Sequence, residues 1–112
     1  MIVSKIQFTA KKNHCGEIKS FIENLAPMFA SNRNCREISV FQTGRDSVTS
    51  LAVYSNQINA NASICGLVKI FEAIAPKLKF LPKREFVGLD EFQNYSDDSL
   101  IFHHEFENGI LN

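Results

Sequence analysis

Apolar and polar positions alternate along four stretches of the chain and follow helical spacing along two others. Residues 2–9 alternate, with Ile2, Ile6 and Phe8 on one side of the chain and Val3 and Lys5 on the other. Apolar residues spaced by three and four positions predict two amphipathic helices. In order, the predicted elements are strand 2–9, helix 15–29, strands 36–43 and 47–55 around a hairpin at 43–46, an Asn-rich connection 56–61, helix 63–79 and strand 84–92.

An internal repeat supports this order of elements. A shift of 49 residues places Glu23 on Glu72 and aligns the segment 23–29 with 72–78, where three of the seven positions are identical. Two β-α-β units of this kind predict a ferredoxin-like α+β fold. We expect an antiparallel sheet of four strands in β-α-β-β-α-β order, with both helices on one face and residues 1–92 forming the domain.

The same shift predicts which side chains face the helices. We expect Leu51 and Val53 to join Ile2, Ile6 and Phe8 under the helices, and Val87 and Leu89 to join Ile38 and Val40. The opposite face then mixes aromatic, small and polar groups, because it carries Lys5, Gln7, Phe41, Tyr54, Phe86 and Asp90. Three aromatic side chains are poorly suited to a water-exposed surface. We therefore expect two such sheets to pack as a homodimer and enclose a cavity lined by these six residues.

Composition narrows the class of protein without naming an activity. Twelve Lys and Arg balance twelve Asp and Glu, and the sequence pI is about 6.8. This balance gives no sign of a nucleic-acid partner. No apolar stretch approaches the ~20 residues that span a bilayer, and residues 2–9 alternate, so we expect no signal peptide and a cytoplasmic protein without a membrane partner. Three separated cysteines, Cys15, Cys35 and Cys65, predict free thiols.

Several short motifs resemble the dimeric α+β barrel superfamily, and most closely the antibiotic biosynthesis monooxygenase-like domains. They are the Lys-Lys-Asn-His turn at residues 11–14, Leu-Ala-Pro at 25–27, Asn34-Cys35 before the second strand, and Leu-Ala-Val-Tyr-Ser at 51–55. The resemblance covers residues 1–92. It implies either a cofactor-independent monooxygenase acting on a small aromatic or polyketide-like substrate, or a non-enzymatic homodimer that binds a small apolar ligand or a protein partner.

The resemblance also argues against haem chemistry and implies no cofactor. The haem-degrading branch requires an Asn on the first strand, a Trp, and a His on the second helix. Here the first-strand position is Lys5, the chain contains no Trp, and residues 61–80 contain no His. For the monooxygenase branch we expect Lys5 to stabilise a bound anion and Tyr54 to donate a hydrogen bond. The alternative is a structural ion pair between Lys5 and Asp90.

The last twenty residues, 93–112, lie outside the repeat. Leu100, Ile101 and Phe102, together with the apolar residues near 106–111, predict a segment that packs on the sheet edge or across a dimer. His103 and His104 resemble metal ligands, but adjacent side chains of an extended segment point in opposite directions. We therefore expect no metal site from this pair. His14 is expected to be an exposed turn residue.

Overall fold

A computed structural model describes residues 1–32, 35–62 and 64–105 of the chain. Its strands are β1 (Ile2–Thr9), β2 (Cys35–Gln42), β3 (Ser47–Tyr54), β4 (Lys83–Val87) and β5 (Leu100–Glu105). Its helices are α1 (Cys15–Asn32), α2 (Gln57–Ala62) and α3 (Ile64–Ile74), followed by 3₁₀ turns at Ala75–Lys77, Leu89–Asn94 and Asp97–Ser99.

The strands form one antiparallel sheet in the order β4-β1-β3-β2-β5. The predicted α+β, ferredoxin-like arrangement is confirmed, with a fifth strand added at the β2 edge. This strand comes from the segment after the repeat, and residues 106–112 lie outside the described residues. Among the described residues, no helix is both long and apolar enough to cross a membrane.

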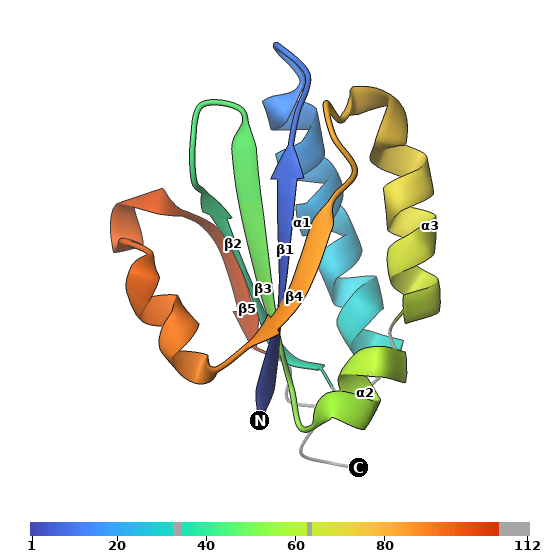
Figure 1. Cartoon of the computed structure of the whole chain (residues 1–112), viewed down its shortest axis with the longest axis vertical. Helices are drawn as coiled ribbons and strands as arrows, with labels where there is room; N and C mark the ends of the chain where they lie inside the picture. Colours follow the sequence, from blue (N-terminus) through green and yellow to red (C-terminus); the bar gives the residue numbers. More distant parts are fainter. Residues whose placement is uncertain (33–34, 63, 106–112) are drawn as a thin grey trace.

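One face of the sheet is covered by helices (Figure 1). Ile18 and Ile22 from α1 and Ile74 from α3 are buried against Ile6, Phe8, Ile38 and Val40 of the strands. The predicted apolar stripes of both helices extend to Leu25, Phe29, Ile64 and Leu67, whose side chains lie outside the described part. The core on this face is built from apolar side chains because each strand places alternate residues beneath the helices.

A crossover segment, residues 88–99, covers the other face. It leaves β4 at one edge of the sheet and enters β5 at the opposite edge, and it runs on the side away from α1 and α3 (Figure 1). Phe92 and Tyr95 of this segment pack on a second cluster of buried residues. That cluster comprises Val3, Phe41, Leu51 and Val53.

Two predicted elements differ from the structure. Strand 84–92 was expected to be continuous, but β4 ends at Val87 and Leu89–Asn94 forms a 3₁₀ helix. Gly88 precedes this change in direction. The connection 56–61 was expected to be irregular, but Gln57–Ala62 forms α2, and α3 begins at Ile64.

The expected facing of β3 and β4 is wrong. Lys5 lies directly opposite Leu51, and Val3 lies opposite both Val53 and Val87, so these residues share the helix-free face. Pairing in this register places odd-numbered residues of β1 beside odd-numbered residues of β3. A repeat shift of 49 converts odd positions into even ones, and a slip of one residue moves every side chain of a strand to the opposite face.

Candidate functional site: a half-buried charge network on the helix-free face

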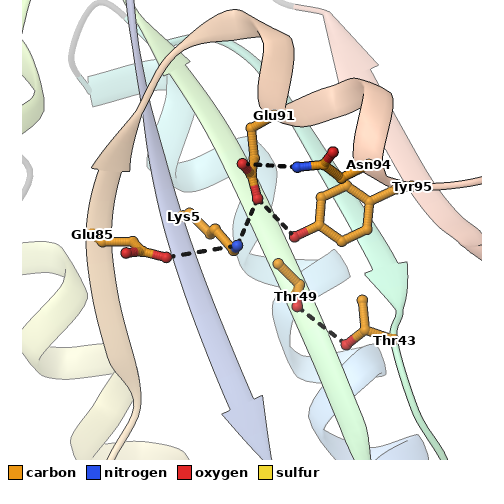
Figure 2. A network of polar contacts seen from close by, with 7 residues as sticks. All are labelled: Lys5, Thr43, Thr49, Glu85, Glu91, Asn94 and Tyr95. Carbon is orange, nitrogen blue, oxygen red and sulfur yellow. Dashed lines mark hydrogen bonds and ion pairs between the residues drawn. The ribbon is translucent and has the colours of Figure 1, made fainter.

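Lys5 is the centre of a polar network on the helix-free face (Figure 2). Its Nζ donates a hydrogen bond to Glu91 Oε1 at 2.6 Å and lies 3.6 Å from Glu85 Oε1. The Lys5 and Glu91 side chains are only 14% and 16% exposed. Strand β1 supplies the ammonium group, and the crossover segment supplies the carboxylate.

Two further residues of the crossover segment hold the Glu91 carboxylate. The Tyr95 hydroxyl donates to Glu91 Oε1 at 3.4 Å, and the Asn94 side-chain amide donates to Oε2 at 3.1 Å. The Tyr95 ring stacks on Phe41 at a centroid separation of 4.7 Å. Lys5 Nζ lies 6.0 Å from the Tyr95 centroid, at the limit of a cation–π contact. Both carboxylate oxygens of Glu91 thus accept hydrogen bonds from the crossover segment, and one of the donors, Tyr95, is itself stacked on Phe41.

The contacts set the protonation of the pair. The hydrogen bond from Lys5 lowers the pKa of Glu91 below its ordinary value, against the opposing effect of burial. The hydrogen bond to Glu91 raises the pKa of Lys5 in turn, again against burial. Both groups are therefore ionised at neutral pH. A carboxylate with a lowered pKa is a weak general base, so Glu91 serves as the counter-ion of Lys5 rather than as a proton acceptor.

The structure separates the six residues predicted to line a pocket. Lys5, Gln7 and Phe41 lie on the helix-free face, where Gln7 is exposed and Phe41 is buried. Tyr54 lies on the helix-covered face and is 1% exposed. Phe86 lies opposite Ser4 on that same face, with the Arg84 guanidinium 4.7 Å from its ring centroid.

The expected ion pair between Lys5 and Asp90 is also wrong. Asp90 is an exposed residue of the 3₁₀ helix, and the neighbouring Glu91 is the partner of Lys5. Glu91 and Tyr95 were not predicted as site residues. A signal for them was present, because alternation of apolar and polar positions ends at Gly88 and two consecutive acids follow it. A turn at this point brings the second acid, rather than the first, over β1.

Comparison with known structures identifies the fold. A protein of unknown function from Nitrosomonas europaea, NE2512, superposes with a TM-score of 0.70 at 16% identity, over 79% of this chain and 87% of that one. A second protein of that organism, provisionally named an antibiotic biosynthesis monooxygenase, gives a TM-score of 0.68 at 11% identity, over 78% and 88%. SnoaB from Streptomyces nogalater, a cofactor-independent oxygenase, gives 0.65 at 13% identity, over 78% and 90%.

The chain therefore has the fold of the antibiotic biosynthesis monooxygenase-like proteins, as the sequence motifs predicted. No protein-family model matches the sequence, and no curated protein sequence matches it. At identities of 11–16% the structural likeness shows the fold alone, so activity has to be argued from the residues.

Proposed function

We propose that the chain acts as a homodimeric, cofactor-independent monooxygenase that binds a small aromatic or polyketide-like substrate as an anion on the helix-free face. The observation that carries the proposal is the Lys5 ammonium, held 14% exposed beside the stacked Phe41 and Tyr95 rings. A cation in such surroundings stabilises a phenolate or enolate more strongly than it does in water. The fold of SnoaB, a cofactor-independent oxygenase, supports the same chemistry.

The reaction needs no added reductant. An activated methylene of the bound anion gives up electrons to O₂ and becomes a carbonyl. One oxygen atom enters the substrate, and the other leaves as water with the two hydrogens of the methylene. A substrate anion would have to displace Glu91 from Lys5, whose charge would then favour the deprotonated substrate, and Tyr95 would orient the aromatic ring. The low pKa of Glu91 makes it a poor base, so the substrate has to be acidic enough to ionise in the Lys5 field.

Oxygen uptake with a panel of hydroxyaromatic and 1,3-dicarbonyl compounds tests this proposal. We expect Lys5→Met to abolish uptake while the far-ultraviolet circular dichroism stays unchanged. Glu91→Gln should lower KM, because it frees Lys5 for the substrate anion. Lys83→Met is the matched control, since Lys83 is an exposed lysine of β4 that lies on the same helix-free face of the sheet as Lys5. Equal uptake by the Lys5→Met and wild-type proteins would contradict the proposal.

A dimer is proposed on different grounds from those the sequence suggested. Tyr95 covers Phe41, and Tyr54 lies beneath the helices, so neither aromatic residue needs a second copy for burial. Leu89 and Leu100, near the two ends of the crossover segment, are 48% and 42% exposed. A specific interface buries about 800 Å² from each partner, and these side chains would contribute apolar contacts at the two ends of the crossover segment.

Sedimentation equilibrium tests the dimer. We expect a dimer at micromolar concentration for the wild-type protein and a monomer for Leu89→Glu. Leu81→Glu is the control, because Leu81 is 87% exposed in the loop between α3 and β4, away from the crossover segment. A wild-type monomer, or equal loss of the dimer in both variants, would exclude this interface.

The second candidate is a non-enzymatic homodimer that binds a small apolar ligand or a protein partner. It is favoured by one observation, namely that Glu91 already neutralises Lys5. Ligand binding that Lys5→Met leaves unchanged, together with no oxygen uptake by the wild-type protein, would select this function.

A further inference from the structure

A second group of side chains with potential metal ligands lies on the helix-free face, at the β2–β5 edge of the sheet. Glu37 of β2 is directly opposite Glu105 of β5, and the adjacent pair on the same face is Ser39 and His103. One ligand atom from each of Glu37, His103 and Glu105 lies within 4.8 Å of the others. His103 Nε2 is 3.6 Å from Glu37 Oε2 and 3.6 Å from Glu105 Oε1.

We propose that Glu37, His103 and Glu105 bind a divalent transition-metal ion, with zinc as the preferred class. In a tetrahedral zinc site with bonds of about 2.1 Å, neighbouring ligand atoms are about 3.4 Å apart. The two distances of 3.6 Å from the imidazole to the carboxylates are close to that value. One nitrogen and two oxygen ligands leave the remaining position for water or a bound ligand.

Charge at this edge of the sheet supports the same conclusion. Like charges directly opposite one another destabilise an antiparallel pair, and Glu37 and Glu105 are such a pair. Within the described ranges, no Lys or Arg forms an ion pair with either carboxylate, and their partner is His103. A divalent cation at His103 Nε2 would offset both charges together.

The orientation of the imidazole is set by a buried residue. Ser39 is 2% exposed, and its Oγ lies 2.7 Å from His103 Nδ1. With a metal on Nε2, the proton of the ring is on Nδ1 and is donated to Ser39 Oγ. Metal-binding histidines usually have a partner of this kind, which fixes the ring and its tautomer. Ser39 is therefore a positioning residue of the proposed site.

This site is separate from the charge network at Lys5. Strand β1 is separated from β5 by β3 and β2, which places the two groups about 14 Å apart at the usual strand spacing. It is also distinct from the histidine pair considered in the sequence. His104 lies opposite Ile38 and therefore on the other face of the sheet from His103. Glu37 comes from the neighbouring strand β2, and Glu105 follows His103 by two positions on β5. The spacing of the two histidines reveals neither acid.

Titration of the metal-free protein with Zn²⁺ and with Co²⁺ tests the proposal. We expect one ion per chain and visible Co²⁺ bands without a thiolate charge-transfer band. His103→Ala should abolish saturable binding, and Glu37→Gln and Glu105→Gln should each weaken it. His104→Ala, on the same strand but the opposite face, is the matched control and should bind as the wild type does.

A second measurement distinguishes positioning by Ser39 from a general structural effect. Ser39→Ala should weaken Zn²⁺ binding by about 10-fold. Nitrogen-15 spectra of the zinc-loaded wild-type protein should show the His103 ring protonated at Nδ1. Equal Zn²⁺ affinity of the wild-type and His103→Ala proteins, or a Co²⁺ thiolate band that disappears in Cys15→Ser, would overturn the proposal.

Discussion

The two faces of the sheet are covered in different ways, and their chemistry differs accordingly. Helices α1 and α3 cover one face with long apolar side chains, and the buried residues there are almost all apolar. The other face is covered by the crossover segment, which has no regular helix longer than the 3₁₀ turn Leu89–Asn94. This thinner cover brings Glu91, Asn94 and Tyr95 over Lys5. The crossover segment supplies an ionised partner for Lys5, whereas the Arg84 guanidinium on the helix-covered face donates hydrogen bonds to the Ser4 hydroxyl and to the Ala60 carbonyl of α2.

The largest difference between the faces is expected for substitutions in the helix-covered core. Tyr54→Ala should lower the free energy of unfolding by about 3–5 kcal/mol, because it leaves a cavity under the helices. Urea denaturation measures this loss. Phe86→Ala is the control, since Phe86 is 37% exposed at the edge of the same face and should cost far less. Similar losses for both variants would contradict the assignment of Tyr54 to the core.

On the helix-free face, breaking the ion pair should cost less. Lys5→Met leaves the Glu91 carboxylate 16% exposed without its cation, and we expect a loss of about 1.5–3 kcal/mol. The double variant Lys5→Met with Glu91→Leu should recover most of that loss, because replacing both partners removes the unpaired charge. Urea denaturation of the two single variants and the double variant completes the cycle. Additive losses would show that the two groups do not interact.

The pH dependence of stability sharpens the comparison further. Because Lys5 lowers the pKa of Glu91, the contribution of Glu91 is present above its ordinary pKa of 4.5 and is lost as pH falls through the lower value of the folded protein. The stability difference between wild type and Glu91→Gln should therefore be greatest near neutral pH and decrease below about pH 4.5. The raised pKa of Lys5 keeps the alkaline limit of the pair above the ordinary value of 10.5. A difference that does not vary between pH 3 and pH 7 would contradict the ion pair.

The smallest effect concerns thiol reactivity and leaves the fold intact. Cys35 is 1% exposed, and burial raises the pKa of its thiol to about 12. Cys15 is half-buried at the start of α1. In a Cys65→Ser background, Ellman's reagent should modify Cys15 in the native protein and Cys35 only after unfolding. Rapid modification of both thiols in the native state would show that the core on the helix-covered face opens readily.

The fold could be predicted because its main signals are local. Alternation along residues 2–9 and helical spacing from Ile18 to Ile22 each reflect one element packed against one layer. The side of the sheet on which each β3 side chain lies was less predictable, since it depends on the pairing register rather than on composition. Leu51 and Ala52 are both apolar, so the sequence around them fits either face, and only the pairing of Lys5 with Leu51 decides between them.

The candidate site was predictable only in part, for the same reason. Lys5 stands out as a charge in an apolar strand, and its face was assigned correctly. Its partner is 86 positions away in the sequence, in a segment whose path depends on a turn after Val87. The sequence prediction continued the last strand through residue 92, which put Asp90 at the position beside Lys5 that Glu91 takes in the structure. The angle of a single turn thus determined which acid reaches the lysine.

The crossover segment also has a consequence for how the chain folds. It joins the two outermost strands of the sheet, so β5 reaches its partner β2 across a long stretch of sequence. The contact between Ser39 and His103 spans 64 positions, and closing so long a loop is slow compared with forming a hairpin. Until that step β2 is an unpaired edge, open to strands of other molecules. Once β5 has paired, the outer strand at this edge carries the polar residues His103, His104 and Glu105, which disfavour pairing with strands of other molecules.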